Sequence, residues 1–359
     1  MKTVSVSFFL ILALLLLTGC SNLLYISSLG WHQAHVSFHS IPIEEVLNDE
    51  QAAPEVQDKI RFVQHVKRYG EEKVGLSKTG SYSRFYEVKG PILYVVTASE
   101  KDRLKPYDWT YPIIGKVTYK GFFTKEEALR EQRELDEKDY DTYLRPSEAY
   151  STLGWLKDPI LSSMLKWDDG SLANLILHEM THATAYFNGK PDFNEQWATF
   201  VGNQGAIDFL SEKFGPESRE VVIAVETQED DLLFSQWIDR ACQRLSTFYS
   251  RAISREEKLK GREEIFQSLQ EDFREMKPRF KTKGFGYFGQ TPLNNAALLA
   301  HQQYFQRQET FQLLYAYLGR NLRSMVEWVK EIRASKEDPG VYMERWMKER
   351  GLSLFSSQR

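Results

Sequence analysis

Apolar residues recur at two different periods along the first part of the chain, which predicts helices followed by strands. Residues 21–70 carry the helical period, with Pro54 opening the second of two helices and Gly70 marking its end. From about residue 82 the apolar residues alternate with polar ones, a period of two that is typical of strands. The sequence therefore predicts a helical segment that leads into a sheet.

The region of period two contains several short strands and one helix. Gly90 and Pro91 break the first apolar run and predict a connection between two neighbouring strands. Thr124 has Glu127 three residues later, the spacing of a capping box at the start of a helix. In order along the chain, the predicted elements are strands at 85–88, 92–96 and 113–123, a helix at 124–135 and a strand at 140–150.

The second half of the chain is predicted to be helical. Asp168 supplies a start signal for one helix, residues 188–191 (Asn-Gly-Lys-Pro) interrupt the pattern, and Asp192 or Asn194 is the expected cap of the next helix. The remaining predicted elements are a charged helical hairpin to about residue 277 with a break near Lys260-Gly261, a helix from Asn294, and helices at 309–318, 322–334 and 341–349. The predicted class is α+β, mostly helical, with a small N-terminal mixed sheet and a helical C-terminal part.

Net charge narrows the range of partners. The formal net charge is -4 and the pI is about 6.1, and no basic stripe interleaves with aromatic residues. Proteins that bind nucleic acid carry a basic surface, so no nucleic-acid partner is expected. The dense charge of residues 216–277 is interpreted as the solvated face of a helical hairpin.

The first twenty residues have the pattern of a secretory signal. Lys2 precedes an apolar run from Val4 to Leu17 that is short for a membrane span, and the run ends at Leu-Thr-Gly-Cys. This ending resembles the bacterial lipobox, in which cleavage leaves the cysteine, here Cys20, as a lipidated first residue. We expect residues 1–19 to be removed and Cys20 to anchor the chain to a membrane. An uncleaved anchor helix is the alternative.

Lipidation of Cys20 leaves one other cysteine. Cys242 then has no partner for an internal disulfide, and it lies in an apolar periodic run that predicts a buried core residue. Ser21 after Cys20 resembles the sorting signal for the outer membrane of a two-membrane bacterium. The expected location is therefore the bacterial cell envelope, at the periplasmic face of the outer membrane.

One stretch carries the pattern of a metal site. His178, Glu179 and His182 form an H-E-x-x-H motif, and on a helix both imidazoles lie one turn apart on one face. Glu179 points to the side, where a carboxylate can take a proton from the attacking water. A catalytic zinc site normally has three protein ligands, and Glu195 is the candidate for the third.

The same motif can also arise by accident on a surface helix. Its context favours the metal site, because residues 172–177 are largely apolar and predict a buried helix. A second group of histidines, His32, His35 and His39, also has helical spacing. No cysteine or carboxylate lies between them, so we interpret them as structural.

The arrangement resembles the gluzincin branch of zinc metallopeptidases, in which the H-E-x-x-H helix is completed by a glutamate on the next helix. More narrowly, the chain resembles the bacterial family called "putative aminopeptidases", found largely as lipoproteins. The segments that carry the resemblance are Ala149–Leu165, His178–Thr184, Asn194–Gly202 and Leu293–Phe305. The resemblance implies a zincin-like fold, zinc bound by His178, His182 and Glu195, Glu179 as general base, and a peptide substrate.

This resemblance also implies an organisation of the chain and further site residues. Peptidases of this branch use a His or Tyr from a C-terminal segment to stabilise the oxyanion, so Tyr304 is the first candidate, followed by His301 and Asn295. The substrate is expected along the edge strand Tyr143–Ser151, with Tyr150 and Asn295 as candidate contacts and a Gly-aromatic loop at 283–290 over the cleft. The expected division is a signal peptide at 1–19, a helical segment at 20–80, and a catalytic domain at 81–359 composed of a sheet subdomain (81–170), metal helices (171–214) and the remaining helices (215–359).

Alternatives remain open at this point. The Gly-x-Met-Glu-Asn segment that binds the substrate amine in well-known zinc aminopeptidases is absent, so an envelope endopeptidase with the same chemistry is the nearest alternative. A non-catalytic zinc-binding lipoprotein and a metal-free interaction lipoprotein are the others. Glu179 argues against the first of these two, because a structural zinc site has no use for a base beside its first ligand.

Overall fold

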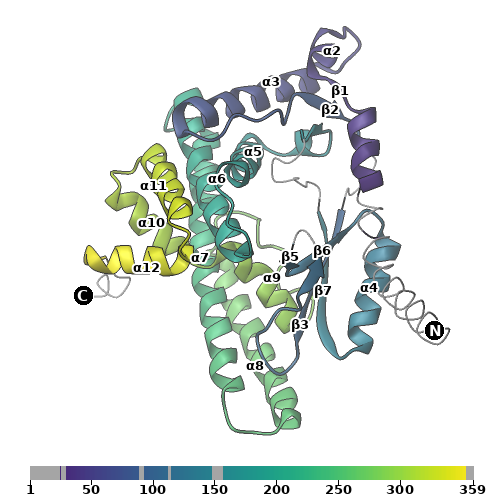
Figure 1. The fold of residues 1–359 in the computed structure, drawn as a ribbon, viewed down its shortest axis with the longest axis vertical. Helices are drawn as coiled ribbons and strands as arrows, with labels where there is room; N and C mark the ends of the chain where they lie inside the picture. The colour runs from purple at the N-terminus through teal and green to yellow at the C-terminus, as the bar shows by residue number, and fades with distance from the viewer. Residues whose placement is uncertain (1–24, 26–29, 89–92, 112–114, 148–156, 353–359) are drawn as a thin grey trace, which may run out of the picture.

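The computed structural model describes Tyr25 and residues 30–88, 93–111, 115–147 and 157–352 (Figure 1). Within these residues the protein is mostly helical with three small sheets, in agreement with the predicted α+β class. The predicted signal segment, Cys20 and Tyr150 lie outside the described residues. No helix in the described ranges combines the length and apolar character needed to span a membrane.

The predicted helices and strands occur in the predicted order, and the short strands at 41–42, 109–111 and 160–161 were not predicted. The strands are β1 (Ile41–Pro42), β2 (Arg84–Tyr86), β3 (Leu93–Glu100), β4 (Trp109–Tyr111), β5 (Gly115–Val117), β6 (Tyr119–Phe122), β7 (Tyr140–Ser147) and β8 (Ile160–Leu161). The helices are α2 (Ile43–Asn48), α3 (Pro54–Tyr69), α4 (Lys125–Glu137), α5 (Asp169–Thr184), α6 (Pro191–Phe214), α7 (Arg219–Tyr249), α8 (Arg255–Met276), α9 (Asn295–Phe305), α10 (Gln308–Tyr317), α11 (Leu322–Ser335) and α12 (Pro339–Glu349). A helical stretch over residues 30–39, one turn of π-helix at Gly70–Val74 and short 3-10 turns at Met164–Lys166 and Lys277–Arg279 complete the described elements.

The two strands on either side of Gly90-Pro91, β2 and β3, do not pair with each other. β2 pairs with β1 and, in parallel, with β8, while β3 is the centre of a separate antiparallel sheet of order β6-β3-β7. The prediction that the strands on either side of Gly90-Pro91 are neighbours was therefore wrong. β3 pairs instead with β7 along eight residues, from Leu93 opposite Ser147 to Glu100 opposite Tyr140, a ladder that three-residue β2 is too short to match.

The two faces of the β6-β3-β7 sheet are covered by different helices. On one face, Val96 and Ala98 pack with Ala128 and Leu135 of α4, and Thr124 caps that helix by accepting the N–H of Glu127, as predicted. On the other face α9 lies along β7. Figure 1 shows α4 on the outer side of this sheet and α9 between the sheet and the remaining helices. The sheet therefore presents its inner face to the centre of the molecule.

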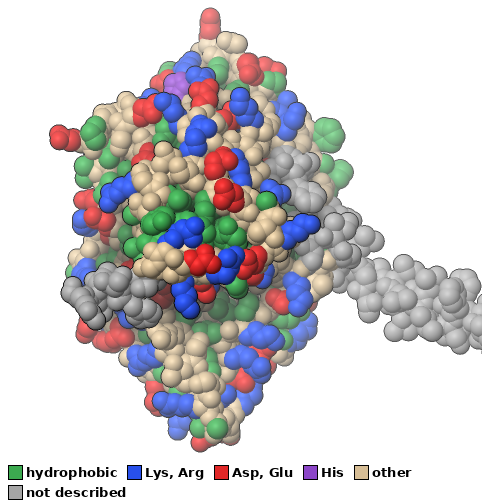
Figure 2. Space-filling model, turned by 60° about the vertical axis from the view of Figure 1, so that its left-hand side comes forward, with side chains coloured by type: hydrophobic (Ala, Val, Ile, Leu, Met, Phe, Trp, Pro, Cys, Tyr) green, Lys and Arg blue, Asp and Glu red, His purple; other side chains and the backbone are tan. Residues whose placement is uncertain are grey.

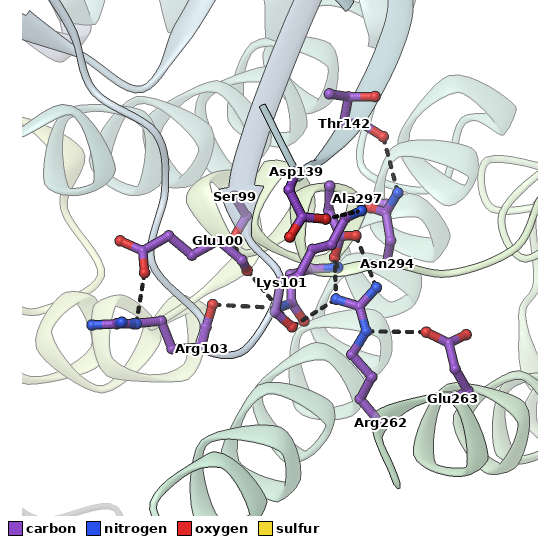
Figure 3. Close-up of polar contacts among 12 residues, drawn as sticks. Ser99, Glu100, Lys101, Arg103, Asp139, Thr142, Arg262, Glu263, Asn294 and Ala297 are labelled. Atoms are coloured by element: carbon purple, nitrogen blue, oxygen red, sulfur yellow. Dashed lines mark hydrogen bonds and ion pairs between the residues drawn. The ribbon is translucent and has the colours of Figure 1, made fainter. Parts of the chain in front are cut away.

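A buried ion pair joins the helical hairpin to this inner face. Arg262 of α8 donates to both oxygens of Asp141 on β7, at 2.8 and 3.0 Å, and also to the carbonyl of Lys101. Asp141 in turn accepts the N–H of Asn295 at the start of α9. Figure 3 shows Arg262 reaching from its helix to this cluster, beside Asn294, which donates to the carbonyl of Thr142. The hairpin, the sheet and α9 are thus connected through the buried side chains of Arg262 and Asp141, which are 9% and 5% exposed.

The hairpin differs from its prediction in one respect. The break between α7 and α8 lies at residues 250–254, where Ser254 forms a capping box with Glu257, and not near Lys260-Gly261. Gly261 lies inside α8, where a Cβ atom would stand 2.4 Å from the ring of Phe248. The glycine thus permits close packing of the two helices and does not end one of them. Cys242, on α7, is buried as predicted, and burial raises the pKa of its thiol to about 12.

The Gly-aromatic segment at 283–290 packs into the core of this hairpin. Phe285 stacks on Phe234 with ring centroids 4.3 Å apart, and Phe288 lies 4.7 Å from Phe273. The segment was expected to cover a cleft. Its ring contacts show that it packs within the hairpin instead. Phe285 and Phe288 have aromatic partners within the hairpin, which removes apolar surface from water, whereas Tyr287 of the same segment is 84% exposed.

The main core surrounds α5 and α6, which cross in close contact. Apolar residues of α3, among them Val63 and Val66, pack on this pair from one side, and residues of α10 and α11 from the other. Two glycines of α6 allow the crossing: a Cβ atom on Gly202 would lie 3.0 Å from the carbonyl oxygen of Asn174, and one on Gly205 would lie 2.8 Å from Leu177. The α5–α6 distance therefore depends on these missing side chains.

Charged side chains of both signs are intermingled over the outer surface that Figure 2 presents. No broad area of a single sign is visible on that face, in keeping with the small net charge of the chain.

The close crossing predicts that Gly202→Ala destabilises the protein. Overpacking of a tight contact costs about 1–3 kcal/mol, which exceeds the roughly 0.5–1 kcal/mol that Ala gains over Gly inside a helix. We expect a lower free energy of unfolding in urea. Gly30→Ala is the control, because a Cβ atom at Gly30 meets nothing within 4 Å. A Gly202→Ala variant as stable as the parent would contradict the importance of this contact.

Candidate metal centre and active site

The histidine helix forms as its sequence predicts. Asp168 caps α5 by accepting the N–H of Ser171 at 2.9 Å. The hydroxyls of Thr181 and Thr184 donate to carbonyls four residues earlier, which satisfies them inside the buried helix. His178 and His182 consequently lie one turn apart on the same face, with ring centroids separated by 4.8 Å.

The turn after this helix brings the glutamate back to the histidines. α6 begins at Pro191, and Lys190 occupies the capping position without a side-chain hydrogen bond, so neither Asp192 nor Asn194 is the predicted cap. Asn194 instead accepts the N–H of Phe187 and donates to its carbonyl, both at 2.9 Å. This two-bond clamp holds the turn against the first residues of α6 and places Glu195 beside the histidines.

Three candidate ligand atoms converge between α5 and α6. Nε2 of His178 and Nε2 of His182 are 3.1 Å apart, and Oε2 of Glu195 lies 3.3 and 3.5 Å from them. A tetrahedral zinc ion bonded at about 2.0–2.1 Å holds its ligand atoms roughly 3.3–3.4 Å apart. Two imidazole nitrogens and a carboxylate oxygen at these separations fit zinc in both chemistry and spacing.

Across the described residues, this is the group of His, Cys, Asp and Glu side chains that is close enough to hold an ion, with ligand atoms within 4.8 Å of one another. The other histidines differ: His32 stacks on Phe123 at 4.4 Å, and Nδ1 of His39 is bonded to the carbonyl of His35. The structural interpretation of those three histidines agrees with these contacts.

The electrostatics of the cluster favour positive charge at its centre. Burial lowers the pKa of His182, but the neighbouring Glu195 carboxylate outweighs it and the net pKa is raised. Burial raises the pKa of Glu195, but the two imidazoles outweigh it and the net pKa is well below its usual range. The side chains of His182, Glu195 and His178 are 3%, 11% and 14% exposed, so one edge of the cluster is open to solvent.

Glu179 lies next to this cluster without being a member of it. It is partly buried, and its carboxylate has no hydrogen bond or ion pair among the described residues. Its charge nevertheless contributes to raising the pKa of four surrounding groups: Tyr82, Tyr119, His182 and Tyr304. A carboxylate in this position is available to accept a proton.

Tyr304, the first candidate for an oxyanion donor, lies close enough to Glu195 and Glu179 for both charges to raise the pKa of its phenol. Burial, and next the charge of Glu195, raises the pKa of Tyr304 to about 12. Its hydroxyl accepts a hydrogen bond from Nη2 of Arg145 at 3.3 Å. The phenol is therefore protonated at neutral pH, and because its oxygen accepts from Arg145, its own O–H can point elsewhere.

The chain matches the model of a protein family described as "Putative aminopeptidase" over residues 24–339. It belongs to this family. The family's description indicates peptide hydrolysis, and the match includes the cluster, Glu179 and Tyr304. No curated protein and no solved structure matches the chain.

Two other candidate site residues of this aminopeptidase-family protein, His301 and Asn295, lie in surroundings different from those of Tyr304. His301 packs against Phe288 at 4.9 Å, and burial and then the charge of Arg145 lower its pKa to about 4. Asn295 is fully buried: its amide donates to the carbonyls of Glu100, Lys101 and Arg103, and it accepts the hydroxyl of Tyr249 at 3.0 Å. This amide therefore holds the chain after β3 and is not free to contact a substrate.

Three residues near the cluster were not singled out by sequence. Tyr119 on β6 and Tyr186 after α5 both have raised pKa values, caused first by burial and then by Glu195. Tyr186 follows His182 by four residues and its ring lies 6.2 Å away, so its place just after the motif was a usable signal although α5 ends at Thr184. For Tyr119 and Arg145 the sequence offers no such signal, because strand register brings them to the site.

The clamp made by Asn194 predicts a large effect of Asn194→Ala. The substitution leaves the buried N–H of Phe187 unpaired and removes one of the two hydrogen bonds to its carbonyl, which still accepts the N–H of Lys190. We expect the free energy of unfolding to fall by about 1–3 kcal/mol. Thermal unfolding of metal-free protein measures the loss. Asn188→Ala, an exposed change on the same turn, is the control and should have little effect. Equal Tm values for the two variants would show that the clamp does not hold the turn.

Proposed function

We propose that the protein is a zinc-dependent peptidase of the gluzincin type that acts on peptides from their amino termini. The observation that carries the proposal is the convergence of His178 Nε2, His182 Nε2 and Glu195 Oε2 from two consecutive helices. Membership of the aminopeptidase family supports the choice of peptide as substrate.

Each group around the cluster then has a role. Zinc, when bound, supplies a Lewis acid that polarises the scissile carbonyl and makes water a better nucleophile at neutral pH. Glu179 takes the proton of the attacking water and delivers it to the leaving amine. Tyr304 donates its O–H to the oxygen that gains negative charge, a function that requires the phenol to stay protonated.

The edge of the sheet offers a place for the peptide backbone. β7 pairs with β3 on one side only, and no described strand pairs with its other side. An extended peptide can add to such an edge through main-chain hydrogen bonds. Because Arg145 on β7 contacts Tyr304 beside the cluster, a peptide bound along this edge lies close to the reacting groups.

The sequence signals at the N-terminus are the basis for proposing that this activity is located in the cell envelope. We propose that a lipid anchor at Cys20 holds the protein at the periplasmic face of the outer membrane. We also propose that the sheet and the two helices of the cluster have a zincin-like arrangement. Metabolic labelling with a fatty acid, lost in Cys20→Ser, is the corresponding check.

The three-ligand site predicts zinc stoichiometry. Purified protein should contain close to one zinc ion per chain, and Glu195→Ala should lose most of it because a ligand is removed. Mass spectrometry of the metal content gives the measurement. Glu179→Gln is the matched control, since it changes a neighbouring carboxylate that is not a ligand and should retain zinc. Absence of zinc in the parent after incubation with the metal would overturn the proposal.

The role of Glu179 predicts loss of turnover without loss of metal. Replacing a positioned general base typically lowers kcat by about 10²–10⁴-fold, and Glu179→Gln should do so on aminoacyl amides and unblocked peptides. Glu217→Gln, an exposed change between α6 and α7, should leave kcat unaltered. If Glu179→Gln keeps the parent's kcat, another group is the base. Hydrolysis of peptides with acetylated amino termini would change the assignment from exopeptidase to endopeptidase.

A further inference from the structure

Arg145 occupies an unusual position on the inner face of the sheet. Arg145 lies on β7, opposite Val95 of β3. Because side chains alternate along a strand, Arg145 is on the same face as Asp141 and Tyr143, toward α9. Its Nη2 atom donates to the hydroxyl of Tyr304, and the centre of its guanidinium is 5.7 Å from the ring of that tyrosine. The side chain is partly buried.

The guanidinium has no carboxylate partner among the described residues. Burial opposes its charge, and the phenols of Tyr304, Tyr143 and Tyr119 favour it. The imidazole of His301 also lies close to it, and burial together with the charge of Arg145 lowers the pKa of His301 to about 4. Arg262, which reaches the same face, differs because Asp141 binds it through two hydrogen bonds. An arginine withdrawn from water without an acid carries an uncompensated cost, which an anionic ligand would offset.

The position of Arg145 relative to the cluster indicates which ligand this is. Tyr304 is the link: it contacts Arg145 directly and is close enough to Glu195 and Glu179 for both to raise its pKa. Arg145 therefore lies one side chain away from Glu195 and Glu179. A peptide in reach of the metal cluster brings its neighbouring residue, or its own carboxyl end, to the guanidinium.

We propose that Arg145 binds a carboxylate of the peptide substrate, so that the enzyme prefers peptides with a negative charge close to the scissile bond. This inference rests on the proposed peptidase function. Arginine suits the task because its planar fork donates two parallel hydrogen bonds to a carboxylate. The carboxylate is either the free end of a short peptide or an Asp or Glu side chain.

A competing role for Arg145 is to position Tyr304 through their hydrogen bond. That role would affect every substrate equally, because the hydroxyl of Tyr304 acts on the scissile carbonyl of each. Carboxylate binding affects only substrates that carry the charge. The ratio of kcat/KM for charged and uncharged substrates of the same length separates the two.

The test compares matched peptides. Ala-Ala-Ala and its carboxamide report on the terminal carboxylate, and Ala-Glu-Ala-NH₂ and Ala-Gln-Ala-NH₂ report on a side-chain carboxylate. We expect the parent to prefer the charged member of at least one pair by about tenfold or more, in line with charge-assisted hydrogen bonds. In Arg145→Met this ratio should fall to about one, and Arg145→Lys should recover part of it. No preference in the parent, or an equal loss on both members of each pair, would overturn the inference.

Binding measurements keep this inference separate from the proposed function. Calorimetry of the Glu179→Gln protein with the same peptide pairs, with and without Arg145→Met and with and without a chelator, reports affinity where no turnover occurs. Carboxylate-dependent binding that Arg145→Met removes, without hydrolysis of any peptide by the parent, would refute the peptidase and retain the carboxylate site. Hydrolysis without carboxylate-dependent binding would retain the peptidase and refute the carboxylate site. Circular dichroism of each variant verifies its fold.

Discussion

The close crossing of α5 and α6 is the constraint on which the candidate site depends. Two histidines on one helix cannot form a three-ligand site, and the glutamate comes from a helix that starts after a sharp turn. Gly202 and Gly205 let the helices approach, and the clamp of Asn194 on Phe187 sets the start of α6. The separations of 3.1 to 3.5 Å between the three ligand atoms follow from this pair of contacts.

The sheet and α9 supply the second half of the site. The register of β7 against β3 directs Asp141, Tyr143 and Arg145 inward, and α9 runs along them with Asn295, His301 and Tyr304 in the same order. The far end of this alignment is locked by the buried pair of Asp141 and Arg262, which ties the hairpin to the sheet. The near end has a tyrosine and an arginine beside the cluster of His178, His182 and Glu195. One end of the alignment is thus structural, and the other end lies at the candidate site.

Some of this arrangement was accessible from sequence for a clear physical reason. The spacing of His178 and His182, the cap at Asp168 and the cap at Thr124 are local properties, decided within one or two turns of a helix. The ends of α10, α11 and α12 were predicted to within a few residues for the same reason. Errors occurred where a residue type has two uses. Gly261 resembles a helix end but permits packing, Asn194 resembles a cap but clamps a turn, and the aromatic segment at 283–290 fills a core.

The sequence by itself determined the helix that carries the histidines, the placement of Glu179 beside them, the mostly helical class and the burial of Cys242. The tertiary structure decided the partner strands of β2 and β3, the burial of Asn295, and the approach of Tyr119 and Arg145 to the cluster. The difference lies in the range of the interactions. Helical period and capping act between residues three or four positions apart. Strand register and helix crossing join side chains that are distant in the sequence, such as Arg145 and Tyr304, and packing of the whole chain selects among many possible pairings.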